Sequence, residues 1–398
     1  MNNLGSLLRF EIKKIVAKRS IKVLFAVLLF ATLLINCWQF MGTTEIRYLD
    51  DSGQVVTEKV SIISAVQTER KYALMYSGQA LDDELIHEMK GFVGEYGFDC
   101  MNMYWIYHTI YELGLNPEAD LASEEGIAKQ LKAEQESIWD ALSLTDSEIR
   151  EWADKTGKIE LPLHIAYTRG YTNMIDNAHW LNMMLVFFVI IVLCDSFSKD
   201  RQVRTRPLIQ SSRNGHGSGI IGRILAGLLV TLGTAVCVYL LSAIIQFGIH
   251  GFDGWSAPIQ QVCGALIWSN LSISAGPAML LMYGTSIVLL LMMAALTMML
   301  SQFFQNAIVS LAIPFGAIFM SMVFNFSIIH RDRDLSQIWR FFPIQRIDLD
   351  IFYDHRLVNL FGISIKSIPF SFMLYGGIIL LAVALCITHT KLTRADRH

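Results

Sequence analysis

The chain contains six apolar runs that are each long enough to cross a lipid bilayer. A helix needs roughly 20 mostly apolar residues to span the hydrocarbon core. The composition agrees, because only 17% of the 398 residues are charged and the mean hydropathy is +0.42. We therefore expect an all-α polytopic membrane protein with six transmembrane helices, near residues 22–41, 179–197, 220–247, 277–300, 307–327 and 369–388.

Basic residues between the runs indicate how the chain is oriented. Residues 1–22, residues 198–223 and the tail after 388 are rich in Lys and Arg and poor in acids. Short basic segments remain on the cytoplasmic side of a membrane. Six spans put all three segments on one side, so we expect cytoplasmic N and C termini in a multi-pass plasma-membrane protein.

A hydrophilic insert separates the first span, 22–41, from the second. Residues 43–178 contain 25 acids and 11 basic residues, a formal charge of −14. Apolar residues recur there at helical spacing, Asp82 and Ser123 are expected N-caps, and Asp51-Ser52-Gly53 is expected to turn a hairpin. We assign 42–178 to an acidic, mostly helical extracellular domain, and 179–398 to spans two to six with their loops.

Residues 1–21 predict an amphipathic helix that lies at the membrane interface. Its expected apolar face carries Leu4, Leu8, Ile12, Ile15 and Val16, and its basic face carries Arg9, Lys13, Lys14 and Lys18. The alternative is a positive flank that only fixes the orientation of the first span.

The loop at 198–223 carries six basic residues, which is more than orientation requires. With Pro207 and a Gly-rich turn, it is typical of a cytosolic segment that docks another protein, although anionic lipid headgroups would attract the same charges. The neighbouring Asp195 is expected at a helix end beside Lys199.

Two external segments carry aromatic side chains. Residues 328–368 mix charges and aromatics, which predicts short external helices at headgroup level. Residues 98–114 offer an apolar surface that fits a domain core, a dimer contact or a substrate-binding strip for a peptide; its members are Met101, Tyr104, Trp105, Tyr107 and Tyr111.

Motifs of enzymes are missing from the sequence. It has no GxxxxGK[ST] phosphate loop, no HExxH pair, no GxSxG elbow and no CxxC. The external histidines lack metal-ligand spacing. We expect neither a catalytic nor a metal site in this chain, no cofactor of its own and no nucleic-acid partner.

The layout resembles the permease subunits of type-2 ABC exporters. The shared features are a basic amphipathic N-terminal helix before the first span, a basic loop after the second, a tight fourth–fifth hairpin at "SQFFQNA" and external helices before the last span. In the loop, Asp200 and Thr205 match the family pattern, and Gly222-Arg223 stands where that pattern has Gly-Lys. Arg204 and "SSRNGHGSG" replace its glycine and its Ser-Pro turn. The acidic insert resembles the enlarged first external loop of some Gram-positive peptide or antibiotic exporters.

The resemblance implies a division of labour between subunits. A separate cytosolic ABC ATPase would hold ATP and Mg, and a second permease, identical or paralogous, would complete the substrate path through the membrane lipids. The expected ATPase-coupling residues are Arg9, Lys13, Lys14, Asp200, Arg204, Thr205, Arg206, Arg213 and Arg223.

The acidic insert favours a cationic or amphipathic peptide of antimicrobial type as the exported substrate, since negative charge concentrates cations. Solubility alone is the other explanation of its charge. The alternative function is a non-transporting membrane receptor or scaffold whose extracellular domain senses a ligand.

Overall fold

The structure is a computed structural model that describes most of the chain. It covers residues 4–112, 123–141, 144–199, 217–262, 266, 269, 271–304, 306–323, 340–343, 352, 357–360 and 363–395. Helices dominate these residues, and the sheets found among them are two two-stranded hairpins. The mostly helical fold expected from the sequence is confirmed for this part of the chain.

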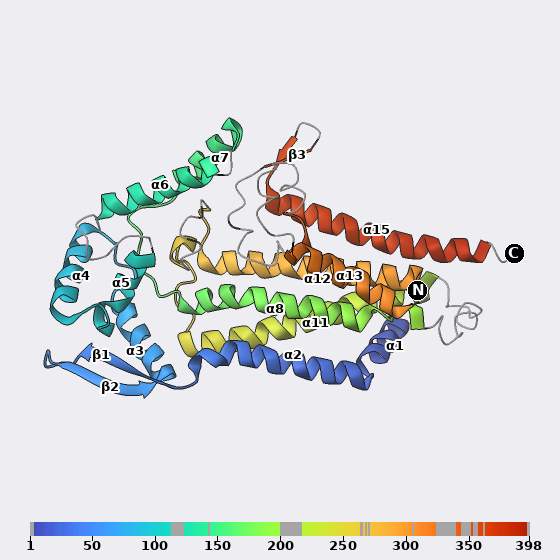
Figure 1. Cartoon of the computed structure of the whole chain (residues 1–398), viewed down its shortest axis with the longest axis horizontal. Coiled ribbons are helices and arrows are strands. Elements are labelled where there is room, and N and C mark those ends of the chain that lie inside the picture. Colours follow the sequence, from blue (N-terminus) through green and yellow to red (C-terminus); the bar gives the residue numbers. More distant parts are fainter. Residues whose placement is uncertain are drawn as a thin grey trace.

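Among the described residues, five helices are long and apolar enough to cross a membrane, which indicates a multi-pass membrane protein. They are α2 (Arg19–Cys37, continued by the 3-10 turn η1, Trp38–Phe40), α8 (Arg169–Leu193), α11 (Gly217–His250), α12 (Ala275–Phe303) and α15 (Ser367–Ala395). Figure 1 shows them running along the same direction. The predicted fifth span coincides with α13 (Ala307–Val323), an apolar helix of 17 residues that contains Pro314. Because 324–339 lie outside the described residues, a sixth span remains a prediction.

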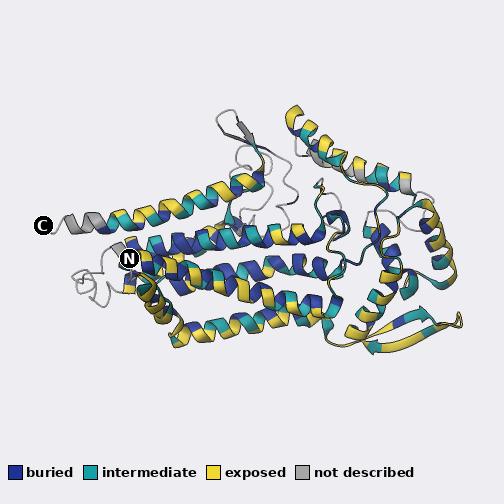
Figure 2. Ribbon diagram, turned by 180° about the vertical axis from the view of Figure 1, so that it is seen from behind, coloured by how far each residue is buried: buried dark blue, intermediate teal, exposed yellow. Residues whose placement is uncertain are grey.

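The bundle is centred on α8 and α12. Their most apolar stretches are 56% and 61% buried, against 22% for the stretches in α2 and α15. Side chains from α8, α11 and α12 form most of one continuous core, which is the dark interior of Figure 2. The peripheral helices expose rows of large apolar side chains, as lipid-facing helices do.

Residues 43–168 form a unit at one end of the bundle that we call the inserted domain (Figure 1). It contains an antiparallel hairpin of β1 (Thr43–Leu49) and β2 (Val55–Ser61). Five helices follow: α3 (Ile62–Met75), α4 (Asp83–Tyr96), α5 (Met101–Glu112), α6 (Glu124–Ala141) and α7 (Asp146–Thr156). Apolar side chains of α4 and α5 build a second core, in which Met89 and Ile110 are fully buried.

The β1–β2 hairpin turns at Asp51-Ser52-Gly53, as predicted. Asp50 Oδ1 accepts hydrogen bonds from the Ser52 hydroxyl at 2.6 Å and from the Ser52 and Gln54 amides at 2.9 Å. These bonds, that of the hydroxyl foremost, hold the pKa of Asp50 below its ordinary value.

Both predicted N-caps are confirmed. The Asp82 carboxylate accepts a hydrogen bond from the Leu85 amide at 3.0 Å, and the Ser123 hydroxyl accepts one from the Gly126 amide at 3.0 Å. Each side chain satisfies a backbone donor that has no partner inside its helix.

The helix of the second span begins at Arg169, well before residue 179, where the span was predicted to start. Its first turns carry Thr172, Asn173, Asp176 and Asn177, which interrupt the apolar pattern. The expected domain boundary at 178 therefore falls inside this helix.

The N-terminal amphipathic helix is separate from the first span. Helix α1 (Leu4–Val16) ends two residues before Lys18, whose backbone is extended with φ −64° and ψ 129°, and α2 starts at Arg19. Figure 1 shows α1 at an angle to α2, which places a bend inside the segment predicted as one helix, 1–21.

The segment before the last span differs from the prediction where it is described. In place of a helix, β3 (Val358–Leu360) and β4 (Ile363–Ile365) form an antiparallel hairpin. Apolar residues alternate there with Asn359 and Ser364, which is a strand pattern that the aromatic and charged neighbours obscured. The hairpin is joined to α7, because the Leu357 amide donates to Glu148 Oε1 at 2.8 Å.

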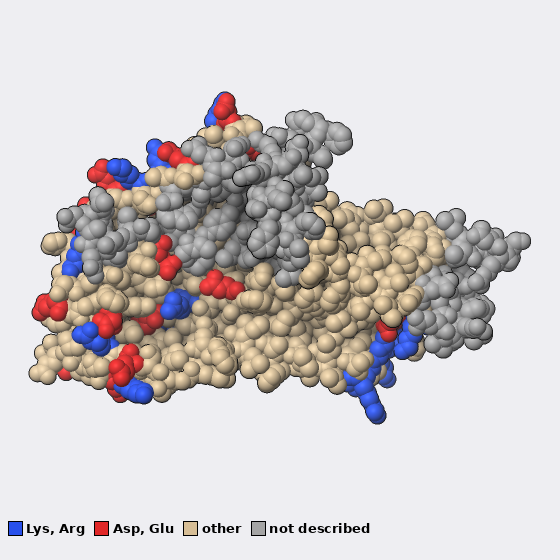
Figure 3. Space-filling model, in the orientation of Figure 1, with Lys and Arg blue, Asp and Glu red and all other residues tan. Residues whose placement is uncertain are grey.

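Charged side chains gather at the two ends of the molecule, as Figure 3 shows. Acids and bases are mixed over the inserted domain, the Lys and Arg residues of α1 lie at the opposite end, and a largely uncharged band separates them. We call these the domain end and the basic end. The band matches the surface that a bilayer would cover, and the assignment of the basic end to the cytoplasm remains a prediction.

Substitution of Gly254 is expected to destabilise the junction between α11 and the inserted domain. Its φ is +87°, and an added Cβ would lie 2.5 Å from the backbone oxygen of Tyr167. Gly254→Ala should lower the free energy of unfolding by about 1–3 kcal/mol, measured as a lower thermal midpoint in detergent. Gly233→Ala, where a Cβ meets nothing within 4 Å, should leave the midpoint unchanged or raise it; equal effects would contradict the prediction.

Candidate functional site

At the basic end, α1 packs along the start of α11. Its inward face carries Leu7, Leu8, Glu11, Ile12 and Ile15, of which Glu11 and Ile15 are buried. A Cβ on Gly222 would lie 3.6 Å from Leu7 Cβ, which is an ordinary van der Waals distance, so α1 and α11 are neighbours at this position. The inward face is rotated toward Leu7 and Glu11 relative to the predicted one, because it packs against α11.

Two ion pairs join the elements that meet at this end. Arg223 at the start of α11 lies 3.4 Å from Glu11, and it donates a hydrogen bond to the Ser196 carbonyl at 3.1 Å. Lys18 donates to both carboxylate oxygens of Asp195 at 2.7 Å. The α1–α2 bend is thereby tied to the end of α8 and to the start of α11.

The predicted coupling residues fall into three groups. Arg9, Lys13 and Lys14 are exposed on the outer face of α1. Arg223 points inward, and its side chain is only 11% exposed. The remaining five lie outside the described residues: Asp200, Arg204, Thr205, Arg206 and Arg213.

Asp195 follows the end of α8, so the predicted helix-end position is confirmed. Its cation partner is Lys18, which is 177 residues away in the sequence. Sequence proximity suggested Lys199 instead, because the fold of α1 against α8 cannot be seen from local spacing.

At the domain end, polar side chains of α2, α8 and α11 form a hydrogen-bonded cluster between apolar helices. Asn36 Oδ1 accepts from the Ser242 hydroxyl at 2.7 Å and from Gln246 Nε2 at 3.1 Å. Asn173 Nδ2 donates to Gln246 Oε1 at 3.0 Å and lies 2.9 Å from His250 Nε2. We call these five residues, together with Asn177, the polar cluster.

A second polar contact joins α8, α11 and α12. Asn182 of α8, fully buried, donates to the Ser286 hydroxyl at 2.9 Å and accepts a short hydrogen bond from the Tyr239 hydroxyl. In hydrocarbon an unpaired polar group costs several kcal/mol, so such groups are retained only with partners.

A spacing of polar residues in the sequence indicates the polar cluster, although the apolar runs alone do not predict it. Ser242, Gln246 and His250 recur every four residues and therefore share one face of α11. The position of Asn36 near the end of the first span supplies the facing acceptor. The partners could not be paired without the fold.

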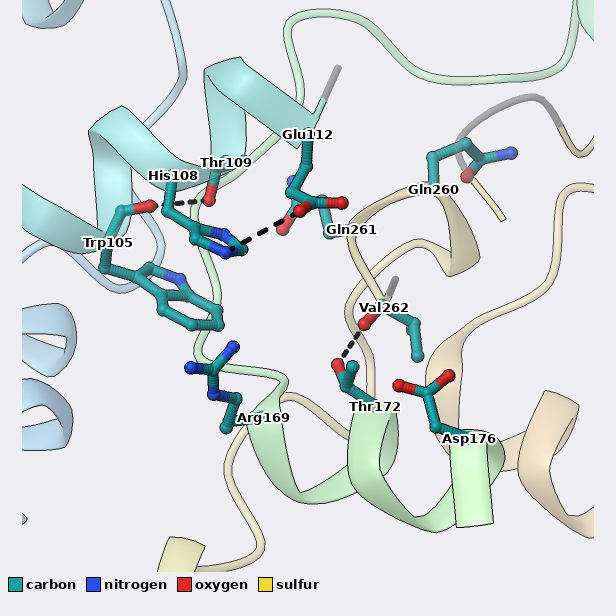
Figure 4. A pocket seen from close by; sticks show the side chains of 10 residues that line it. All are labelled: Trp105, His108, Thr109, Glu112, Arg169, Thr172, Asp176, Gln260, Gln261 and Val262. Carbon is teal, nitrogen blue, oxygen red and sulfur yellow. Dashed lines mark hydrogen bonds and ion pairs between the residues drawn. The ribbon is translucent and has the colours of Figure 1, made fainter. Parts of the chain in front are cut away.

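A cavity of about 200 Å³ opens beside the polar cluster, between α5, the start of α8 and the turn η2 (Ile259–Gln261). Figure 4 shows side chains from these three elements around it. Its lining residues are Trp105, His108, Thr109, Glu112, Arg169, Thr172, Asp176, Gln260, Gln261 and Val262.

The positive charge of the lining residue Arg169 is partly balanced by a carboxylate outside the cavity lining. Arg169 lies 3.7 Å from Glu69, a carboxylate that is 6% exposed. Burial raises the pKa of Glu69 and Arg169 opposes that shift. Burial, with a further contribution from Arg169, lowers the pKa of His108, so this histidine is neutral at neutral pH.

Of the five residues predicted to form an apolar surface in 98–114, only Trp105 lines the cavity. Its indole donates to the Ala166 carbonyl at 3.0 Å. Tyr107 packs against the domain core, Tyr111 is 62% exposed, and Met101 and Tyr104 are half-buried. The segment forms α5 and contributes to the domain core through its other face.

Among the described residues, no group of three or more His, Cys, Asp and Glu side chains could hold a metal ion. Comparison with known proteins gave no match to a family model, to a curated protein or to a solved structure.

Loss of Glu11 or Arg223 is expected to loosen the basic end. Glu11→Ala and Arg223→Ala should each lower the free energy of unfolding by about 1.5–3 kcal/mol, because each removes the oppositely charged neighbour of a nearly buried side chain. The double variant should cost less than the two single losses together, measured by thermal or denaturant unfolding in detergent. The exposed pair Asp154–Lys158, at 2.6 Å, is the matched control and should show no coupling; additive effects at Glu11 and Arg223 would contradict the prediction.

Replacement of Gln246 tests the polar cluster. Gln246→Leu removes the partner of Asn36 and Asn173 and should lower the free energy of unfolding by about 1–3 kcal/mol. Gln67→Leu, on an exposed position of α3, should change the thermal midpoint little. A midpoint for Gln246→Leu equal to that of the unmodified protein would show that the cluster does not hold the helices together.

Proposed function

We propose that the chain is a membrane-spanning permease subunit of an ATP-driven exporter of the type-2 ABC class. The observation that carries the proposal is the arrangement at the basic end. There, α1, the end of α8 and the start of α11 are joined by the Glu11–Arg223 and Lys18–Asp195 pairs. A push on α1 or on the loop between α8 and α11 would be transmitted to three long helices.

A separate ATPase is required by this proposal. The sequence has no phosphate-binding loop, so ATP and Mg would be bound by a partner on the basic side. Arg9, Lys13 and Lys14 are exposed on α1 and would contact it. Arg223 would act from inside, by holding α1 in place for that contact.

A second permease copy or a paralogue would complete the path. The outer faces of α2 and α15 carry large exposed apolar side chains, including Phe30 at 60% and Leu380 at 72%. In this proposal, lipid and the second permease share these faces. An acidic domain on the outer side favours a cationic or amphipathic peptide as the exported substrate.

The second candidate function is a membrane receptor or scaffold that senses a ligand without transport. The cavity at the domain end favours it, because the cavity lies between the inserted domain and the helices. A receptor would retain the cavity but would have no ATPase partner.

Purification of the full-length tagged chain from its native membranes tests the proposal. We expect an ABC ATPase to be recovered with it and identified by mass spectrometry. The triple variant Arg204→Glu, Arg206→Glu and Arg213→Glu should reduce recovery of the ATPase by about tenfold. A basic loop would dock on an acidic surface of the ATPase, and the three introduced acids would be repelled by that surface.

The matched control reverses three exposed lysines of the inserted domain, Lys71, Lys129 and Lys132, and should leave recovery unchanged. If no ATPase is recovered, the exporter proposal fails and the receptor remains. If the ATPase is recovered equally with the arginine triple variant, the loop is not the docking element.

A further inference from the structure

We propose that the cavity between α5, α8 and η2 binds the cationic nitrogen group of a small ligand, an ammonium or a guanidinium. If the chain is an exporter, as proposed above, this ligand would be a cationic group of the exported molecule. The binding site itself follows from the lining residues.

The lining is rich in hydrogen-bond acceptors. The Thr109 hydroxyl donates to the Trp105 carbonyl at 2.8 Å, and the Thr172 hydroxyl donates to the Val262 carbonyl. Both hydroxyls therefore offer their lone pairs to the cavity. Gln261 donates through Nε2 to the His164 carbonyl at 2.8 Å, whereas its Oε1 is buried and accepts no hydrogen bond. A ligand with several N–H donors would satisfy these groups.

The charge of the lining favours the same ligand. Among the lining residues that the structure describes, Glu112 and Asp176 are carboxylates and Arg169 carries the fixed positive charge. Glu69, behind Arg169, is more than nine-tenths buried, and its Oε1 accepts no hydrogen bond. Arg169 is therefore balanced by Glu69. Glu112 lies 3.7 Å from His108, which is neutral, so its carboxylate contributes a negative charge to the described part of the lining.

The shape limits the ligand to a small group. A cavity of about 200 Å³ accommodates a cationic headgroup with a short alkyl chain and is too small for a folded peptide. Trp105 and Val262 provide apolar contact for the chain. The indole of Trp105 already lies 6.0 Å from the Arg169 guanidinium, which shows that a cation is tolerated at its face.

Three five-carbon probes separate charge from size: cadaverine, 1,5-pentanediol and glutarate, which are cationic, neutral and anionic. Binding to the full-length chain in lipid nanodiscs is measured by isothermal titration calorimetry. We expect cadaverine to bind at least about tenfold more tightly than 1,5-pentanediol and to lose affinity with added salt. Glutarate should not bind.

Charge-neutralising variants locate the site. Glu112→Gln and Asp176→Asn should each weaken cadaverine binding by about tenfold. The matched controls Glu84→Gln and Asp51→Asn, on exposed positions of the inserted domain, should bind as the unmodified protein does. If Asp176→Asn lowers the thermal midpoint, Glu112→Gln at the end of α5 decides alone.

Equal binding of cadaverine and 1,5-pentanediol would overturn the proposal, as would unchanged cadaverine affinity in Glu112→Gln. Recovery of the ATPase distinguishes the two proposals. If cadaverine does not bind but the ATPase is recovered, only the cation-site proposal is rejected. If cadaverine binds but no ATPase is recovered, the exporter proposal is rejected and the cation site is retained.

Discussion

The fold depends on keeping polar side chains paired between apolar helices. Helix α8 enters the bundle with Thr172, Asn173, Asp176 and Asn177 in its first turns, in a region where most neighbours are apolar. Each such group that is buried among apolar side chains must find a hydrogen-bond partner, because an unpaired buried polar group is costly. The start of α8 therefore has two polar faces. On one face, Asn173 and Asn177 join the polar cluster with α2 and α11. On the other, Thr172 and Asp176 line the cavity.

This division also connects the inserted domain to the bundle. His250 of the polar cluster lies 3.2 Å from the Tyr167 hydroxyl, and the Tyr167 ring packs 4.8 Å from that of Trp105. Arg70 of α3 forms a further ion pair, 2.6 Å long, with Asp253 beyond the end of α11. The domain is therefore fixed to the helices by specific polar contacts at the edge of the cavity, and a bound ligand would contact both parts.

Much of the fold could be predicted from sequence because its signals are local. The length of the apolar runs predicted five of the spans, and helical periodicity predicted the helices of the inserted domain. Asp82 and Ser123 were predicted as N-caps of two of these helices. The start of α8 was predicted too late because its polar residues are explained only by partners on α2 and α11. The β3–β4 hairpin was predicted as helix because aromatic and charged neighbours outweighed a short alternation.

The candidate sites were less predictable for the same reason. Arg223 was found as a basic residue, but its inward position depends on Glu11, which is 212 residues away in the sequence. Trp105 was predicted as one of five residues of an apolar surface, four of them aromatic, and only the fold places it at the cavity. Charge and composition identify which residues are unusual, whereas contacts between distant segments decide what each one does.

Helix α11 joins the two ends of the molecule as one uninterrupted rod. It runs from Gly217 to His250 without a proline, and about 40 Å separate Arg223 from His250 at the rise of an α-helix. Helices bend sharply mainly at proline or where the backbone ladder is broken, and α11 contains no proline. The ion pair with Glu11 and the contact with Tyr167 therefore lie at opposite ends of one helix, so a rigid tilt of α11 would displace both contacts together.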